Sequence, residues 1–546
     1  MEIISCKQLT FAYNGSSRKT LENITFDVQS GDIVLLAGLT GSGKSTLLRL
    51  LKKEIAPAGT LTGSITVCGR DQSEITQRES AELIAYVSQD PDTQAVTHKV
   101  STELAFGLEN LGEKPSRILS RVGEMATYFG IENIYDKLID ELSGGEKQLC
   151  SLCAAAVMSS KLLILDEPAA QLDPIGSHKL FSALRRLNSE LGTTIIIAEH
   201  EPREIFEVCT KVIFLENGTS RCFENKEDFC RIAADDAVMK GYLPTSVRAT
   251  LPLGKPAFTV RDAKSALQAA FGPQPQPEQQ ATEHSSAQAA LEAKNVYFRY
   301  ERSGKDVLSQ LDLSLRKGEI FAAVGSNGSG KTTMLKVLSG ILRPWQGKLK
   351  LFSKPFKSYK GNTLYRGSIA LMPQDPYDLF TLQTVEKCFE QVCSDMGSKG
   401  GYSELCERFS LSHLLGMHPY DLSGGEIQKC AVVKLLLTQP QVMFMDEPSK
   451  GLDPGAKQML GELLRELAAQ GKTICLATHD IEFAAKFADR CGLFFNGKIQ
   501  SLCDTSDFFI HNRFYTTDSC RIARELFPCA VTAEQLEDSV DNALGR

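Results

Sequence analysis

The chain alternates short apolar runs with longer stretches in which apolar and polar residues follow a helical spacing. The runs "DIVLLAG", "LLILDE" and "TTIIIAEH" predict strands, and "TLLRLLKKEI" and "HKLFSALRRLNSEL" predict the helices between them. Short strands also precede the first run, in "ISCKQLTFAY", and a matching stretch, "LEAKNVYFRY", occurs later. Strand–helix alternation of this kind predicts an α/β domain around a largely parallel sheet.

The whole pattern occurs twice. "GLTGSGKST" returns as "GSNGSGKTT", "LLILDEP" returns as "VMFMDEP", and "LSGGE" appears at 142–146 and again at 422–426. Ser143 and Asp166 are 23 positions apart, as are Ser423 and Asp446. A repeat with constant internal spacing predicts two homologous domains in tandem.

The repeat and the composition between its copies predict five segments. Residues 272–290 are mainly Pro, Gln, Ser and Ala with almost nothing to bury, and we expect a flexible linker there. The other expected segments are a first domain at 1–240, a helical appendage on it at 241–271, a second domain at 291–504 and a C-terminal helical appendage at 505–546.

Composition and charge exclude several classes of protein. The chain is 42% hydrophobic and 23% charged, as in average globular proteins, and its net charge of -7 argues against binding nucleic acid through bulk basicity. No apolar run reaches eighteen residues, so we expect no self-inserted transmembrane segment, and the N-terminus lacks the pattern of a secretion signal. The 16 cysteines are scattered without a framework spacing, which is typical of reduced thiols in the cytosol.

Each copy carries a glycine loop between a predicted strand and a predicted helix. Such a loop closes its backbone N–H groups round phosphate oxygens, and the helix N-terminus adds its positive dipole end. Lys44 is expected to reach the β and γ phosphates, and Ser45 to ligate magnesium. Lys331 and Thr332 repeat these positions in the second copy.

An acidic pair follows each loop, at the end of an apolar strand. Asp166 and Asp446 are placed to hold magnesium through water. Glu167 and Glu447 come next, and a carboxylate there can polarise the attacking water in phosphoryl transfer.

Together the glycine loops, Gln89, "LSGGE", "DEP", "LDP" and His200 resemble the ATP-binding cassette (ABC) ATPases over essentially the whole chain, twice. The resemblance implies two tandem cassette domains, each with a P-loop NTPase core, an antiparallel β subdomain and a helical subdomain. It also implies that the cassettes pair within the chain, with two ATP molecules and Mg²⁺ at the interface. Each ATP would lie between one glycine loop and the "LSGGE" of the other cassette, which explains the two copies.

The resemblance also assigns roles to individual residues. The tyrosines would stack on adenine, the glutamines would sense the γ-phosphate and magnesium, and the histidines would hold the γ-phosphate. The residues implied in ATP binding are Tyr13, Gly38, Gly41, Gly43, Lys44, Ser45, Thr46, Ser143, Gly144, Gly145, Tyr300, Gly325, Gly328, Gly330, Lys331, Thr332, Thr333, Ser423, Gly424 and Gly425. Those implied in catalysis are Glu167, Glu447, His200, His479, Gln89 and Gln374. Those implied in magnesium binding are Ser45, Gln89, Asp166, Thr332, Gln374 and Asp446, and Asp173 and Asp453 would bridge the two halves.

The chain departs from the family at one place. Leu149 and Lys429 stand where the family often has an arginine soon after the signature, so fine tuning at the two interfaces is expected to differ. Neither catalytic glutamate is replaced, and we expect two competent sites.

Residues 86–110, "YVSQDPDTQAVTHKVSTELAFGLEN", are similar to the region after the glutamine loop in ATPases of energy-coupling factor transporters. "PSKGLDP" and "AEHEPREI" are also similar to that group. This resemblance implies an ATP hydrolase and translocase motor on the cytoplasmic face of the cell membrane. It would work with a membrane coupling subunit and a membrane substrate-binding subunit, importing a vitamin or a transition-metal ion, without a nucleic-acid partner.

The alternative is a soluble twin-cassette ATPase acting on ribosomes or nucleic acid. A ribosome-acting protein is expected to carry a long, charged, helical segment between its domains and a basic surface. Here that segment is short and barely charged, and no zinc-type cysteine pairs interrupt the domains as a DNA-repair version would require. The sequence therefore favours the transport motor.

Overall fold

The computed structural model describes residues 1–15, 18–170, 172–200, 202–272, 288–359, 361–397 and 401–545. The chain divides into two compact units, Met1–Pro244 and Thr245–Arg546. Of the expected linker at 272–290, residues 273–287 lie outside the described residues. Among the helices that the structure describes, none is both long enough and apolar enough to cross a membrane.

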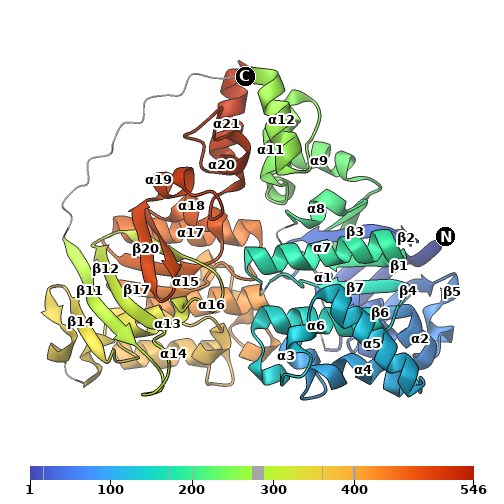
Figure 1. Ribbon diagram of the computed structural model, residues 1–546, viewed down its shortest axis with the longest axis horizontal. Helices are drawn as coiled ribbons and strands as arrows, with labels where there is room; N and C mark the ends of the chain where they lie inside the picture. The colour runs from blue at the N-terminus through green and yellow to red at the C-terminus, as the bar shows by residue number, and fades with distance from the viewer. Residues whose placement is uncertain are drawn as a thin grey trace. The chain divides into compact units, whose positions relative to one another are not determined.

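The first unit contains two sheets (Figure 1). A four-stranded antiparallel sheet has the order β2-β1-β4-β5, and a six-stranded sheet has the order β10-β9-β3-β8-β7-β6, with only the edge pair β9–β10 antiparallel. The strands are β1 (Glu2–Tyr13), β2 (Leu21–Gln29), β3 (Ile33–Gly38), β4 (Gly59–Val67), β5 (Arg70–Asp71), β6 (Ile84–Val87), β7 (Leu162–Asp166), β8 (Thr194–Ala198), β9 (Lys211–Glu216) and β10 (Thr219–Phe223). The α-helices are α1 (Lys44–Leu50), α2 (Gln77–Leu83), α3 (Pro91–Gln94), α4 (Val100–Asn110), α5 (Pro115–Phe129), α6 (Gly144–Val157), α7 (Pro174–Leu191), α8 (Ile205–Val208), α9 (Lys226–Asp235) and α10 (Ala237–Lys240).

The second unit repeats this plan. Its sheets have the orders β12-β11-β14-β15 and β16-β17-β18-β13-β19-β20. The strands are β11 (Ala289–Phe298), β12 (Leu308–Arg316), β13 (Ile320–Val324), β14 (Gln346–Leu351), β15 (Lys354–Pro355), β16 (Ile369–Met372), β17 (Val442–Asp446), β18 (Thr473–Thr478), β19 (Arg490–Phe495) and β20 (Lys498–Asp504). The α-helices are α11 (Thr245–Thr250), α12 (Val260–Phe271), α13 (Lys331–Leu338), α14 (Val385–Met396), α15 (Ser403–Arg408), α16 (Gly424–Leu437), α17 (Pro454–Ala469), α18 (Ile481–Phe487), α19 (Thr505–His511), α20 (Asp518–Ala523) and α21 (Ala533–Ala543).

The burial of the strands follows their residue pattern. Every residue of β3, β7 and β8 is buried, as expected for parallel strands covered on both faces. In β12 the buried Leu311, Leu313 and Leu315 alternate with exposed Asp312 and Ser314, so this antiparallel strand has one apolar face. A separate apolar core joins α4, α5 and α6. The expected fold class, two tandem cassettes each with an α/β core, an antiparallel sheet and a helical part, is confirmed.

A small helical module completes the second unit. It consists of α11 and α12, before the linker, and α20 and α21, near the C-terminus, which lie side by side (Figure 1). Its shared core comprises Ala249, Ala257, Ala263, Leu267, Ile522, Ala523, Leu526, Ala530, Leu536 and Val540. Ion pairs cross it at its rim, from Arg248 to Glu537 and from Lys264 to Glu525, both at 2.8 Å.

This packing differs from the expected arrangement of two separate appendages. From the sequence we expect residues 241–271 to be an appendage of the first cassette, whereas α11 and α12 pack within the second unit. The reason is burial, because Leu267 on α12 is fully buried in an apolar core to which α20 and α21 also contribute. The exact boundaries of the five segments stay a prediction.

We predict that the helical module holds the two fragments together after the chain is cut between residues 273 and 287. Leu267→Ala, which removes a fully buried side chain, should cost about 2–4 kcal/mol and loosen the fragments roughly 30- to 700-fold. Leu119→Ala, at a side chain 69% exposed on α5, is the matched control and should cost less than about 0.5 kcal/mol. Size-exclusion chromatography of the cut protein across a dilution series, without nucleotide, measures the association. Equal behaviour of the two variants would contradict the prediction.

Candidate functional site

The glycine loop of the first unit joins β3 to α1, and its carbonyl oxygens bind the lysine that begins the helix. Gly38 has φ +145° and approaches β9 so closely that a Cβ atom would lie 2.1 Å from the Leu215 carbonyl oxygen. Gly43, with φ +99°, turns the chain into the helix. The Lys44 side chain is buried, and its Nζ donates to the carbonyl oxygens of Gly38 at 2.8 Å and Leu39 at 3.1 Å. The ammonium group is thereby held at the centre of the loop.

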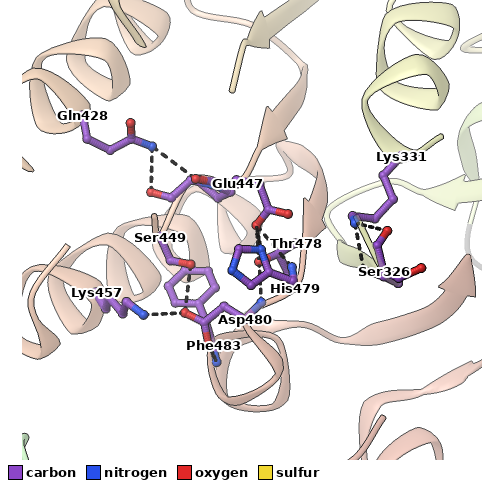
Figure 2. Close-up of polar contacts among 12 residues, drawn as sticks. Ser326, Lys331, Gln428, Glu447, Ser449, Lys457, Thr478, His479, Asp480 and Phe483 are labelled. Carbon is purple, nitrogen blue, oxygen red and sulfur yellow. Dashed lines mark hydrogen bonds and ion pairs between the residues drawn. The ribbon is translucent and has the colours of Figure 1, made fainter. Parts of the chain in front are cut away.

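The second loop, between β13 and α13, has the same geometry. Lys331 Nζ donates to the carbonyl oxygens of Gly325 at 2.8 Å and Ser326 at 3.1 Å (Figure 2). A Cβ atom on Gly325 would lie 2.5 Å from the Phe494 carbonyl oxygen, so only glycine fits there as well.

Polar side chains from four elements meet at the carboxyl end of the first parallel sheet. Ser45 Oγ donates to Asp166 Oδ1 at 3.0 Å, and the Tyr86 hydroxyl donates to Asp166 Oδ2 at 3.1 Å. Glu167 Oε2 accepts from Gln89 Nε2 at 2.7 Å, and His200 Nε2 lies 2.7 Å from Glu167 Oε1. The predicted residues Ser45, Gln89, Asp166, Glu167 and His200 are therefore brought together.

The cluster in the second unit has a different set of contacts. Glu447 Oε2 accepts from Thr478 Oγ1 at 3.1 Å and from the His479 backbone N–H at 3.2 Å, and His479 Nδ1 lies 2.9 Å away (Figure 2). Thr332 hydrogen-bonds the Asp446 side chain. Gln374 is exposed and makes no hydrogen bond to Glu447 within the part of the chain that the structure describes.

Both glutamates adopt a backbone conformation that side chains other than glycine rarely adopt. Glu167 has φ +47° and Glu447 has φ +50°, in the left-handed region, which costs of order 1–3 kcal/mol. The turn is held by hydrogen bonds from Glu167 N to the Ala198 carbonyl oxygen at 3.0 Å and from Glu447 N to that of Ala477 at 2.8 Å. Strain at the same residue in both units indicates that the direction of this carboxylate matters.

The electrostatics separate the two acids of each pair. Burial raises the pKa of Glu167, but the adjacent His200 and Lys44 outweigh it and keep the pKa below its usual value. Burial, with the charge of Glu167, raises the pKa of Asp166. Burial likewise raises the pKa of Asp446, to about 6. In each pair the surroundings thus favour the ionised form of the glutamate more strongly than that of the aspartate.

The predicted tyrosines lie at the edge of each cluster. The Tyr13 hydroxyl is 2.8 Å from Thr46 Oγ1, and the Tyr300 hydroxyl is 3.0 Å from Thr333 Oγ1. Each hydrogen bond ties the antiparallel sheet to the first turn of the helix after the glycine loop. Tyr13 is 39% exposed and Tyr300 63%, which leaves room for stacking at each.

The signature serines begin helices α6 and α16. Ser143 N and Oγ both donate to Glu146 Oε2, at 2.8 and 2.7 Å, and Ser423 makes the same pair of bonds to Glu426. Gly144, Gly145, Gly424 and Gly425 form the first turns of these helices. The capping box accounts for the glutamate of "LSGGE" and leaves a glycine N-terminus suited to an anion.

The predicted interface residues also cap helices. Asp173 accepts from the Gly176 N–H and Asp453 from the Ala456 N–H, both at 2.8 Å, at the starts of α7 and α17. Their role in joining the halves, and the pairing of each glycine loop with the opposite signature, stay predictions.

The structure adds functional candidates that the sequence analysis missed. Tyr86 binds the predicted magnesium ligand Asp166, and its counterpart in the second unit is Leu371. Glu199, which precedes His200, accepts from the Ala169 N–H at 3.0 Å, and burial together with the charge of Glu167 raises its pKa to about 8. Thr478 stands at the same place in the second unit. Comparison of the two repeats could have revealed these differences, but not their contacts.

The residues present fit a nucleoside triphosphate and a magnesium ion. Ser42 and Ser329, at matching places in the two loops, each bury a hydroxyl oxygen that has no hydrogen-bond partner within the described chain. Ser45 Oγ and Asp166 Oδ1, 3.0 Å apart, offer the hard oxygen ligands that Mg²⁺ takes alongside phosphate and water. Bound magnesium would neutralise charge on the phosphate oxygens.

The family of this chain follows from comparison with known proteins. The ABC transporter family model matches residues 21–170 and 308–450. A Bacillus anthracis protein named "Putative ABC transporter ATP-binding protein" is 37% identical over 549 residues, covering 98% of each chain. A Streptomyces avermitilis protein of the same name is 32% identical over 91% of this chain and 93% of its own.

Similarity of fold extends to proteins with other tasks. The archaeal ribosome recycling factor aABCE1, solved in complex with the ribosomal stalk protein aP1, has a TM-score of 0.58 over 92% of this chain and 90% of its own. At 20% identity this likeness concerns the fold alone. The family model, matched once in each cassette, and the full-length relatives lead to one conclusion: the chain belongs to the ABC transporter family and is one of its ATP-binding ATPases.

Proposed function

We propose that this chain is the ATPase motor of an energy-coupling factor type importer, acting at the cytoplasmic face of the cell membrane. It hydrolyses ATP at two composite sites and drives uptake of a vitamin or transition-metal ion through a membrane coupling subunit and a membrane substrate-binding subunit. The observation that carries the ATPase part is a buried glutamate that contacts a histidine and whose pKa is lowered by this histidine and the glycine-loop lysine, present in both cassettes.

In this proposal each side chain has a defined task. Lys44 and the loop N–H groups bind the β and γ phosphates, and Ser45 and Asp166 hold magnesium with help from Gln89. Glu167 orients and polarises the attacking water, and His200 holds the γ-phosphate. The second cassette uses its matching residues, with Glu447 and His479 in the last two roles.

The composite arrangement is supported by the separation of functions within each cassette. The glycine loop, the acidic pair and the histidine meet at the carboxyl end of the sheet. The signature serine instead begins α6 or α16 and hydrogen-bonds a glutamate of its own first turn. The N–H groups of the glycines at this helix N-terminus are suited to the nucleotide of the other cassette.

The importer part rests on residues 86–110 and on the full-length relatives. This stretch forms the end of β6, α3 and α4, and it exposes Val96 at 64% and Phe106 at 36%. Exposed apolar side chains on a short segment suit contact with a helix of a membrane subunit. The alternative, a ribosome-acting ATPase, has only similarity of fold in its favour.

Glu167→Gln and Glu447→Gln test the catalytic assignment. Each change should leave ATP affinity within about threefold, because the lost carboxylate acts mainly in the transition state. The double variant should lose at least about 100-fold in ATPase rate, the scale of a general base. Binding is measured with a fluorescent ATP analogue and turnover by phosphate release. A double variant with wild-type turnover would refute the assignment.

The composite pairing predicts an unequal outcome for two double variants. Lys44→Ala and Ser423→Arg should disable the same site, so together they should lose little more than either alone. Lys44→Ala with Ser143→Arg should damage both sites and abolish turnover. Steady-state ATPase rates of the single and double variants test this pairing. Additive losses of rate in the Lys44→Ala/Ser423→Arg variant would mean that Lys44 and Ser423 serve different sites.

The location of the protein separates the importer from its alternative. The chain should sediment with membranes only when its coupling subunit is coexpressed. Val96→Asp should reduce that fraction several-fold, and Leu191→Asp, at a side chain 57% exposed at the end of α7, should leave it unchanged. Cosedimentation with ribosomes at moderate salt in a membrane-free lysate would refute the importer and leave the ATPase standing.

A further inference from the structure

We propose that Asp480 is a positioning residue for the catalytic pair of the second cassette, held by Lys457 and Ser449 and acting through Thr478 and His479, and that the first cassette lacks these two donors at the matching places. The two hydrolytic sites then differ in what keeps their glutamate in place. This inference rests on the proposed role of Glu167 and Glu447 in hydrolysis.

Asp480 follows His479 directly and lies at the start of α18. Its side chain is 10% exposed. Oδ2 accepts from Ser449 Oγ at 2.9 Å and from Lys457 Nζ at 2.7 Å, and Oδ1 accepts from the Phe483 N–H at 3.0 Å (Figure 2). Burial raises the pKa of Asp480, but the Lys457 ammonium and these hydrogen bonds outweigh it and hold the pKa at about 2. Asp480 is therefore a carboxylate fixed at both oxygens.

A continuous series of hydrogen bonds connects Asp480 to the catalytic glutamate. The Asp480 N–H donates to Thr478 Oγ1 at 3.0 Å, and Thr478 Oγ1 donates to Glu447 Oε2 at 3.1 Å. The His479 N–H between them donates to the same Glu447 oxygen. Residues 478–480 thus wrap round the carboxylate, and a shift of Asp480 would move the two hydrogen-bond donors, Thr478 Oγ1 and the His479 N–H, that reach it.

The far end of this series is anchored on the segment that follows Glu447. Ser449 is two positions after the glutamate, and Lys457 lies in the first turns of α17. From the other side, Gln428 Nε2 on α16 donates to the Pro448 carbonyl oxygen at 3.0 Å (Figure 2). The network therefore ties the catalytic loop both to α17, which begins after the interface candidate Asp453, and to the signature helix.

Two donors of this network have no counterpart at the matching places of the first cassette, and Glu201, at the place of Asp480, lies outside the described residues. Ala169 stands at the place of Ser449 and Ser177 at the place of Lys457, so neither the hydroxyl nor the ammonium donor exists. There the Ala169 N–H donates to Glu199, and Ser177 Oγ donates to Glu204 at 3.3 Å. Glu167 is instead held by Gln89 and His200.

An ordinary helix cap explains only part of this arrangement. Capping α18 needs one carboxylate oxygen of Asp480, which accepts from the Phe483 N–H. The other oxygen receives a hydroxyl and an ammonium from outside α18. A purely structural role would lower stability without distinguishing between the two hydrolytic sites.

The test uses the full-length chain in two backgrounds. Glu167→Gln leaves hydrolysis at the second site, and Glu447→Gln leaves it at the first. Lys457→Met removes the donor and keeps most of the apolar stem. Single-turnover hydrolysis, with protein in excess over ATP, measures each remaining site, and ATP affinity and the thermal midpoint are measured on the same samples.

Lys457→Met should slow the single turnover about 10- to 100-fold in the Glu167→Gln background, the scale of a misplaced catalytic group, and less than twofold in the Glu447→Gln background. ATP affinity should stay within about threefold in both. Lys264→Met is the matched control, because it removes an exposed ion pair of 2.8 Å within the same unit, and it should change neither rate. Ser449→Ala should reproduce the site-selective loss at a smaller size, about 3- to 10-fold, and carries the test if Lys457→Met does not fold.

Three results would overturn the positioning role. The first is that Lys457→Met slows single-turnover hydrolysis equally in both backgrounds, and the second is that it slows hydrolysis in neither. The third is that the Glu167→Gln variant alone shows no measurable single turnover, which would mean that Glu447 has no separately positioned site. If instead the Glu167→Gln/Glu447→Gln double variant hydrolyses ATP at the wild-type rate, the proposed function itself fails.

Discussion

Two carboxylates, Glu167 and Glu447, have to stay charged while 94% or more of each residue is enclosed by protein. An ionised carboxylate without compensation costs several kcal/mol to bury, so charges and donors must reach it from elsewhere. The lysine comes from the glycine loop, the histidine from the loop after β8 or β18, and the turn of each glutamate is closed by the carbonyl group of a neighbouring strand. Only the carboxyl edge of a parallel sheet brings these segments to one place.

Much of this arrangement could be predicted from the sequence, because the constraints on it are local. A glycine at position 38 or 325 is required by its close approach to the next strand, and the lysine, hydroxyl and acidic residues have fixed spacings from it. Apolar runs that end in Asp-Glu predicted strands that end at the site. These features depend either on residues nearby in sequence or on the position of a strand in the sheet. The spacing of apolar and polar residues along the chain indicates both.

The rest depends on contacts that no local pattern expresses. The left-handed turn at Glu167, the hydroxyl of Tyr86 on Asp166 and the buried Glu199 become evident only when separate strands are placed together. Short amphipathic helices such as α12 show that an apolar face exists, but not which helices will cover it. For the same reason, the shared catalytic residues of the two cassettes do not reveal that different side chains surround them.

The helical module has a consequence for how the protein is made. Its first half, α11 and α12, ends at Phe271, and its second half begins at Asp518, 247 positions later. At a synthesis rate of about 5–20 residues per second, the face of α12 that carries Leu267 leaves the ribosome roughly 12–50 s before its partners exist. During that interval a finished first cassette is followed by an uncovered apolar surface, and the whole second cassette must be synthesised before that surface is buried. The nascent chain therefore passes through a stage at which chaperones, or an early wrong contact, can reach Ala263 and Leu267, which the native protein buries.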